Sequence, residues 1–266
     1  MPSFHGHAPC CVRCVPESVS RTVRIAAVGD LHYSRASQGS LLPYLSRVHE
    51  DADVLVLCGD LTDYGLAEEA AILARDLQTA VRIPMVGVLG NHDYESDQAP
   101  EVMRILREAG MTLLDGDTTE INGVGFAGVK GFCGGFGRGV LGGWGEPVVK
   151  QFVNEAIAEA LKLESALARL RMPAKVAILH YAPIRDTVEG EPLEIFPYLG
   201  CSRLEEPLTR YPVNTVVHGH AHHGAPEGRT SNGTPVYNVS LPLMRESAPE
   251  RPYRILTVET SMEVPT

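Results

Sequence analysis

Val54-Leu55-Val56-Leu57-Cys58-Gly59-Asp60 is an apolar run that stops at a glycine and a carboxylate. Four consecutive aliphatic residues are typical of a strand that is buried on both faces, as in a parallel sheet. An unpaired charge at the end of such a strand would be costly to bury. The stretch therefore predicts a central strand that presents Asp60 for chemistry.

Four further apolar runs end on polar residues in the same way. They are 24–28 before Asp30 and His32, 85–89 before Asn91, His92 and Asp93, 176–179 before His180, and 215–217 before His220 and His222. The carboxyl ends of strands in a parallel-type sheet converge on one edge, where ligands bind. We therefore expect side chains from five segments to meet there. Asp60 is the natural centre, because a carboxylate has two oxygens and can bridge two cations.

The bulk composition restricts the class of protein. The chain has 266 residues, of which 44% are hydrophobic, which suits one large α/β domain with a full core. The net charge of −10 argues against a long nucleic acid as partner, although metal ions could still attract a small phosphate ester. No apolar run approaches the roughly 20 residues of a membrane span, and the first twenty residues lack the apolar core of a signal peptide. The six cysteines form no disulfide framework, so we expect a cytoplasmic protein without membrane attachment.

The domain organisation follows from the same survey. Residues 1–20 contain three prolines and no periodicity, so we expect a disordered N-terminal tail. Cys11 and Cys14 have the spacing of half a zinc site, but no second pair follows, so a loose tail is the preferred interpretation. Residues 21–266 are expected to form one domain.

Periodicity and breakers predict the elements between these motifs. Helices are expected over 41–50, 67–80, 100–109, 147–172 and 203–210, a strand or hairpin over 121–129, and closing strands over 236–239 and 253–258. The buried face of the longest helix is expected to include Phe152, Val153, Ile157 and Leu161. Residues 131–145 contain eight glycines, so they are expected to form a loop, either a mobile rim over the site or a plain connection.

The residues at the strand ends indicate a metal site. Two aspartates, one asparagine and four histidines suit borderline divalent ions such as Mn²⁺, Fe²⁺, Co²⁺, Ni²⁺ or Zn²⁺. Their number fits two ions that share a bridging ligand, and such a pair is a common device for cleaving phosphoesters.

These motifs resemble the five sequence blocks of the calcineurin-like metallophosphoesterases. The blocks are Asp30-x-His32, Gly59-Asp60, Gly90-Asn91-His92-Asp93, His180 and Gly219-His220-x-His222, in the order of that family and within residues 24–258. The resemblance implies a first metal ion held by Asp30, His32, Asp60 and His222. It implies a second held by Asp60, Asn91, His180 and His220. It also implies that His92 approaches the leaving-group oxygen, paired with Asp30 or another acid.

The same resemblance implies a fold and a reaction. The family fold is a four-layer αββα sandwich of two mixed sheets flanked by helices. Its reaction is the hydrolysis of a phosphoester by a hydroxide that bridges the two metal ions, with Asn91, His92 and Asp60 as the catalytic residues here. The wording of the motifs is most similar to the class III cyclic-nucleotide phosphodiesterases, but the same words occur in other branches, so the substrate does not carry over.

We therefore expect a metal-dependent phosphoesterase that acts on a small phosphodiester, for example a nucleotide. The alternatives within enzymes are a phosphomonoesterase and a protein phosphatase. The alternative outside enzymes is a metal-dependent scaffold protein, which would be expected to have lost ligands, whereas none is lost in this sequence. Arg35, Arg185 and Arg245 are candidates for binding the phosphate, or are solvated surface residues.

Overall fold

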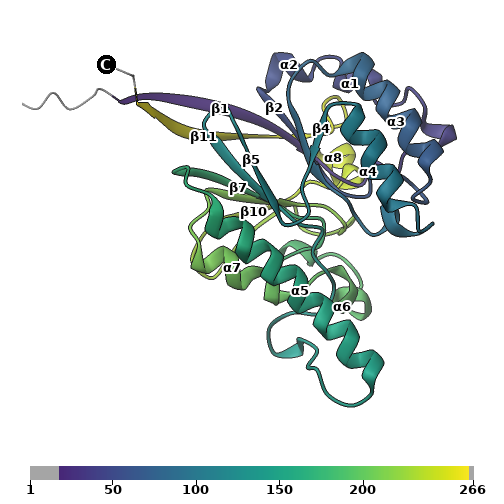
Figure 1. Cartoon of the computed structure of the whole chain (residues 1–266), viewed down its shortest axis with the longest axis vertical. Coiled ribbons are helices and arrows are strands. Elements are labelled where there is room, and N and C mark those ends of the chain that lie inside the picture. The colour runs from purple at the N-terminus through teal and green to yellow at the C-terminus, as the bar shows by residue number, and fades with distance from the viewer. Residues whose placement is uncertain (1–17, 264–266) are drawn as a thin grey trace, which may run out of the picture.

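The computed structural model describes residues 18–263, which form two β-sheets stacked face to face (Figure 1). The strands of the first sheet are β1 (Ser18–Val28), β2 (Val54–Cys58), β3 (Met85–Val88), β4 (Met111–Leu113) and β11 (Arg254–Glu263). Those of the second are β5 (Asp117–Ile121), β6 (Val124–Gly128), β7 (Ala174–Ile178), β8 (Thr215–His218), β9 (Glu227–Arg229) and β10 (Pro235–Asn238).

Both sheets are mixed. The first has the order β11-β1-β2-β3-β4, with β11 antiparallel to β1 and the other pairs parallel. The second has the order β5-β6-β7-β8-β10-β9, in which only the edge strands β5 and β9 are antiparallel to their neighbours. Parallel pairing places the carboxyl ends of the inner strands on one edge, as the motifs require.

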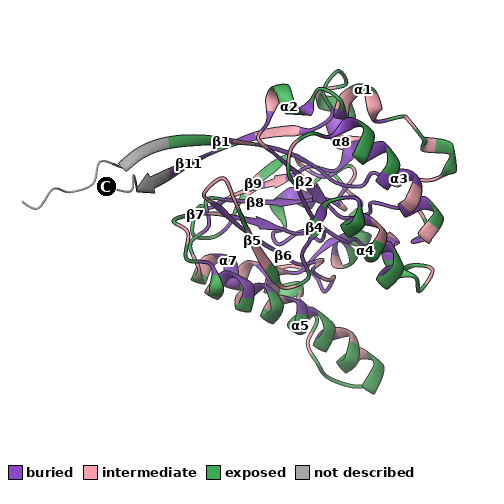
Figure 2. Ribbon diagram, turned by 45° about the horizontal axis from the view of Figure 1, so that its top comes forward, coloured by how far each residue is buried: buried purple, intermediate pink, exposed green. Residues whose placement is uncertain are grey.

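Helices cover both outer faces, as Figures 1 and 2 show. The helices beside the first sheet are α1 (Leu42–Leu45), α2 (Val48–Asp51), α3 (Ala67–Ala80), α4 (Ala99–Glu108) and α8 (Leu241–Ser247). Those beside the second are α5 (Pro147–Arg169), α6 (Phe196–Leu199) and α7 (Glu205–Arg210). The connecting 3₁₀ turns are Arg35–Ser37, His92–Tyr94, Gly137–Gly139, Asp186–Val188, Leu193–Ile195 and Ser202–Leu204. The expected four-layer αββα fold is confirmed.

The core is divided by the sheets into layers. Val56 of β2 packs with Phe126 of β6 between the two sheets, whereas Leu55 and Leu57 pack with Leu73 of α3 on the outer face. All five residues of β2 have no exposed surface. The prediction of a central strand buried on both faces is confirmed, because a strand between two apolar layers needs hydrophobic residues at every position.

The predicted elements differ from the structure at three places. The helix expected over 41–50 is two short helices, because the backbone N–H groups of Arg47 and Glu50 each donate three residues back rather than four. Ile157 and Leu161 of α5 are exposed, and its buried face runs through Glu159 and Leu163 instead. Strand β1 begins at Ser18, three residues inside the segment expected to be disordered, and the rest of that segment lies outside the described residues.

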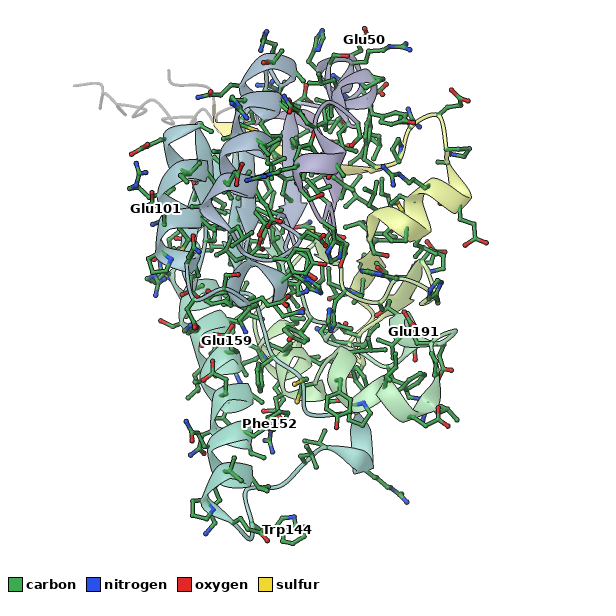
Figure 3. All side chains as sticks on the ribbon, turned by 90° about the vertical axis from the view of Figure 1, so that its right-hand side faces the viewer. Glu50, Glu101, Trp144, Phe152, Glu159 and Glu191 are labelled. Atoms are coloured by element: carbon green, nitrogen blue, oxygen red, sulfur yellow. The ribbon has the colours of Figure 1, made fainter. Side chains whose placement is uncertain are left out.

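The glycine-rich segment and the first turns of α5 project from the body of the molecule. Trp144 lies at the far end of this projection and is 75% exposed (Figure 3). The segment contains only one short turn, Gly137–Gly139, so its loop character is confirmed. Within residues 18–263, no helix has the length and apolar character that crossing a membrane requires.

Candidate metal centre

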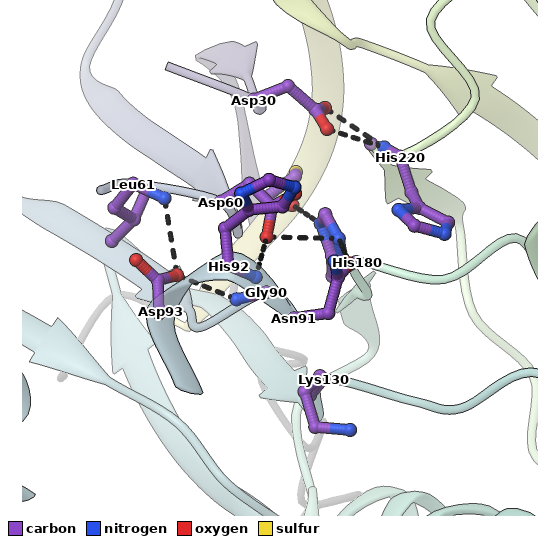
Figure 4. A network of polar contacts seen from close by, with 12 residues as sticks. Asp30, Asp60, Leu61, Gly90, Asn91, His92, Asp93, Lys130, His180 and His220 are labelled. Atoms are coloured by element: carbon purple, nitrogen blue, oxygen red, sulfur yellow. Dashed lines mark hydrogen bonds and ion pairs between the residues drawn. The ribbon is translucent and has the colours of Figure 1, made fainter. Parts of the chain in front are cut away.

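The carboxyl ends of β1, β2, β3, β7 and β8 deliver the motif residues to one place, as Figure 4 shows for most of them. The local backbone there is unusual. Asp30, His32, Asp60 and His220 have positive φ angles of 56°, 43°, 47° and 70°, a conformation that is uncommon for residues other than glycine. The left-handed backbone therefore occurs directly after β1, β2 and β8, at residues that carry candidate ligands.

The glycines of the motifs permit this close approach. A Cβ atom on Gly90 would collide with the carboxylate of Asp60, and one on Gly219 would collide with that of Asp30. These glycines therefore allow neighbouring backbone to pass directly against the two carboxylates. This explains physically why glycine precedes the polar residue in these two motifs.

Among residues 18–263, three groups of side chains have ligand atoms within 4.8 Å of one another. The groups are Asp30, Asp60, His180 and His220; Asp30, His32 and His222; and His32, Asp60 and His92. Asn91 joins the first group, because its Oδ1 lies 2.9 Å from Nε2 of His180. The structure thus brings together all seven side chains expected to bind metal, and places the carboxylates of Asp30 and Asp60 in two groups each.

The Asp60 carboxylate is held by neighbours on two sides. Its Oδ1 accepts the backbone N–H of His92 at 2.8 Å and lies 3.4 Å from Nε2 of His180. Burial alone would raise the pKa of Asp60, but the His180 ring and the His92 amide hold it below its ordinary value. Asp60 is therefore a permanent anion at neutral pH.

Two ring nitrogens that face Asp60 fit a cation. Nε2 of His32 is buried, has no hydrogen-bond partner and lies 3.8 Å from Oδ2 of Asp60. Nδ1 of His180 donates to the backbone carbonyl of Cys58 at 2.9 Å, so its Nε2 is the nitrogen that faces Asp60. A buried polar atom without a partner is unfavourable, and a divalent ion beside Asp60 would satisfy Nε2 of His32. The donor set of imidazole and carboxylate suits the borderline divalent ions.

His220 and His222 approach Asp30 from the loop after β8. The backbone N–H of His220 donates to both carboxylate oxygens of Asp30 at 2.9 Å, and Nε2 of His222 lies 3.1 Å from Oδ1. Nε2 of His220 donates to the backbone carbonyl of Tyr198 at 3.1 Å, which leaves Nδ1 free to bind an ion. Burial lowers the pKa of His220 to about 4, so this ring is neutral at physiological pH, as a metal ligand must be.

His92 lies at the rim of the cluster, and its ring packs edge-on against His32 with 4.6 Å between ring centres. Its Nδ1 lies 2.6 Å from the carbonyl oxygen of Asp63 and 3.6 Å from the carboxylate of Glu95. The expected partner of His92 is Asp30 or another acid; its Nδ1 faces the carboxylate of Glu95, whereas Asp30 contacts His220 and His222. The other nitrogen of the ring is the one available to a substrate.

Asp93 belongs to the motif Gly90-Asn91-His92-Asp93, but the sequence alone indicated no role for it. Its buried carboxylate accepts the backbone N–H groups of Leu61, Thr62 and Gly90 and the hydroxyl of Thr62, at 2.6–3.2 Å (Figure 4). Burial and the charge of Asp60 raise the pKa of Asp93 to about 6. Asp93 therefore ties the loop after β2 to the loop after β3 and fixes the position of Asp60 between them.

Asp93→Ala should lower the free energy of unfolding by about 3 kcal/mol or more, because several buried N–H groups would lose their acceptor. The measurement is urea unfolding followed by circular dichroism. Glu120→Ala, on the exposed edge strand β5, is the control and should change the value by less than about 0.5 kcal/mol. Similar small losses in both variants would mean that Asp93 does not hold the loops together.

The flanking histidines and the candidate arginines lie outside the cluster. His218 is fully buried and its Nε2 lies 2.8 Å from the hydroxyl of Thr187. His223 is exposed. Arg35 and Arg185 form exposed ion pairs with Glu68 and Glu189, so their charges are already matched.

Comparison with known proteins gives independent support for the family resemblance that the sequence motifs indicate. The family model of the calcineurin-like phosphoesterases matches residues 23–224. No curated protein matches the chain. One solved structure aligns with a TM-score of 0.58 at 16% identity, covering 83% of this chain and 91% of that one.

Two further solved structures share the fold. The protein TT1561 of Thermus thermophilus aligns with a TM-score of 0.51 at 14% identity, over 89% of this chain and 98% of that one. A Staphylococcus aureus protein named "Putative 5'-Nucleotidase", in complex with alpha-ketoglutarate, aligns with a TM-score of 0.52 at 16% identity, over 82% of this chain and 48% of that one. At such identities the structures show a shared fold, whereas the family model covers most of the sequence, and on that ground the chain belongs to the calcineurin-like phosphoesterase family.

Proposed function

We propose that this protein is a phosphoesterase with a dinuclear metal centre that hydrolyses a small phosphodiester. The observation that supports this most strongly is the sharing of Asp30 and Asp60 between adjacent groups of ligand atoms. Two carboxylates, each within reach of two groups of ligands, suit two ions held close together.

The proposed ligand sets are those that the resemblance to the family implies. Asp30, His32, Asp60 and His222 would hold the first ion, and Asp60, Asn91, His180 and His220 the second. Asp30 has a carboxylate oxygen within 4.8 Å of ligand atoms in both groups, so it is a further candidate for the bridge beside Asp60. Mn²⁺, Fe²⁺, Zn²⁺, Co²⁺ and Ni²⁺ all suit this set of nitrogen and oxygen donors.

Two ions bound here would polarise the phosphoryl oxygens and activate a water molecule at neutral pH. The residues of the chain supply the remaining requirements. Asn91 would orient a phosphoryl oxygen through its amide, in addition to binding metal. His92 would donate a proton to the leaving alkoxide, since its Nδ1 is anchored on the carbonyl of Asp63 and its other nitrogen is unused.

The preference for a small substrate, such as a nucleotide, rests on the net charge of −10, which disfavours long nucleic acid. A phosphomonoesterase and a protein phosphatase are the alternatives that use the same centre. We further propose a cytoplasmic location, consistent with Cys58, Cys133 and Cys201 being free and buried.

The proposal is tested with purified protein and Mn²⁺ against bis(p-nitrophenyl) phosphate and p-nitrophenyl phosphate. Faster turnover of the diester supports a phosphodiesterase, and faster turnover of the monoester favours the alternative. A scaffold protein would bind metal and hydrolyse neither ester.

Removal of metal should reduce hydrolysis by roughly 10³-fold or more, because charge stabilisation by the ions contributes several kcal/mol to the transition state. The measurement is the hydrolysis rate after dialysis against a chelator, and again after addition of Mn²⁺. The unfolding temperature should fall and recover in parallel, since ions that bind only the folded state stabilise it. Full activity after elemental analysis has shown the metal to be gone would refute the proposal.

A further inference from the structure

Lys130 is a cation at the edge of the metal centre that none of the motifs includes. It follows the carboxyl end of β6, next to the strand that delivers His180. Its backbone carbonyl accepts the N–H groups of His180 and Tyr181 at 3.0 and 3.1 Å. Figure 4 shows its side chain beside Asn91 and His180. Lys130 therefore belongs to the same sheet edge as the metal ligands.

Three aromatic rings surround the Lys130 ammonium group. It lies 5.7, 5.0 and 5.3 Å from the ring centres of Tyr94, Phe132 and Tyr181. Tyr94 and Tyr181 come from the loops that carry Asn91 and His180, so the rings hold the ammonium between two loops of the site. Contacts between ammonium and ring faces are attractive but satisfy none of its hydrogen-bond donors.

The ammonium has no carboxylate partner among the described residues. Its one hydrogen bond there is to the carbonyl of Gly131 at 2.8 Å, and none of these residues offers a carboxylate oxygen within 4.0 Å. Burial lowers the pKa of Lys130 and the charge of buried Glu159 counteracts this, but the two oxygens of Glu159 bind the N–H of Gly131 and the ammonium of Lys162. Two N–H donors of Lys130 are thus left for a ligand, and a half-buried cation of this kind favours an anion.

The distance from this cation to the metal ligands is bounded. The ammonium is 5.3 Å from the ring centre of Tyr181, and that centre is 4.5 Å from the ring centre of His220. The distance from the Lys130 ammonium to the ring centre of His220 therefore cannot exceed the sum of these two distances. One small organic molecule could therefore reach both the metal centre and Lys130.

We propose that Lys130 is a specificity residue that binds an anionic group, a carboxylate or a second phosphate, on the organic part of the substrate. This inference rests on the proposed phosphoesterase function and adds to it a class of substrate, namely phosphoesters with a second negative charge a few bonds from the phosphorus. Tyr94, Phe132 and Tyr181 act as positioning residues that hold the ammonium toward that charge.

The direct test is binding to the Mn²⁺-loaded protein by calorimetry. The two probes are 3-phosphonopropionate and propylphosphonate, which have the same chain length and differ in the terminal carboxylate. The protein should bind the carboxylate compound roughly 10- to 100-fold more tightly, the range expected of a charge-assisted hydrogen bond. Lys130→Met should abolish this difference, Lys130→Arg should keep part of it, and the control Lys150→Met, exposed on α5, should keep all of it.

A kinetic test separates recognition from packing. The substrates are p-nitrophenyl phosphodiesters whose second ester group is ethyl, 2-carboxyethyl or 2-phosphoethyl. Lys130→Met should raise KM about 10-fold or more for the two anionic esters, with kcat and the ethyl ester nearly unchanged. A response to only one anionic ester identifies which anion is recognised.

Equal affinity of the original protein for both phosphonates would overturn the inference, as would an equal rise in KM for all three esters in Lys130→Met. Neither result would affect the proposed function. If neither phosphonate binds and no ester is cleaved, the proposed function and this inference both fail.

Discussion

Asp60→Ala is expected to abolish phosphoester hydrolysis and to leave the protein with less than one metal ion per chain. Asp60 is the buried anion at the end of the central strand, and its carboxylate lies within ligand distance of two groups of side chains. Loss of a bridging ligand should weaken both ions together. Since the ions contribute several kcal/mol to the transition state, the rate should fall by roughly 10³-fold or more. The measurements are the rate with p-nitrophenyl esters and the metal content by elemental analysis.

His222→Ala is the matched comparison for Asp60→Ala. His222 contacts the carboxylate of Asp30 and belongs to one ligand group, so its loss should weaken chiefly one ion. Asp60→Asn keeps the shape of the side chain and should behave like Asp60→Ala if the charge is what matters. An Asp60→Ala protein that still contained two ions per chain would show that Asp60 is not the bridge, and Asp30 would then be the residue to replace.

His92→Ala is expected to slow the cleavage of alkyl or nucleotide diesters by roughly 10²–10⁴-fold, the usual contribution of a general acid. The same variant should lose much less on p-nitrophenyl esters. An alkoxide leaving group needs a proton, whereas p-nitrophenolate hardly does. The position of His92 at the rim, with Nδ1 anchored on the carbonyl of Asp63, fits a proton donor. The comparison of kcat/KM for the two kinds of ester measures the effect.

Metal content decides between the other roles of His92. The ring also lies within ligand distance of His32 and Asp60, so it could bind an ion. Equal losses on both ester types with both ions present would make His92 a phosphate-binding residue. Equal losses with one ion missing would make it a metal ligand.

The location of the site was predictable from the sequence because strands of a parallel sheet end at one edge. Asp30, Asp60 and His180 each follow an apolar run, and the structure places them together for that reason. Lys130 follows such a run as well, after Val129, but a lone lysine at a strand end has too many surface roles to be singled out. Its significance depends on the three rings around it, two of which, Tyr94 and Tyr181, come from distant segments.

Other features depend on tertiary contacts, which cannot be predicted from the periodicity of the sequence. Glu159 can be buried on α5 because the N–H of Gly131 and the ammonium of Lys162 bind its oxygens. A buried face predicted from the spacing of hydrophobic residues alone does not include such a glutamate. Ile157 and Leu161 are apolar but face solvent on the same helix. The role of Asp93 likewise depends on N–H groups that two loops direct at one carboxylate.

The left-handed backbone at Asp30, His32, Asp60 and His220 means that selection for stability and selection for metal binding favour different residues at these positions. Such a conformation costs on the order of 1–3 kcal/mol at a residue that is not glycine, and less at aspartate. Glycine at any of these positions would relax the chain while deleting a ligand. A laboratory search for heat-resistant variants of the metal-free protein would therefore erode the centre first.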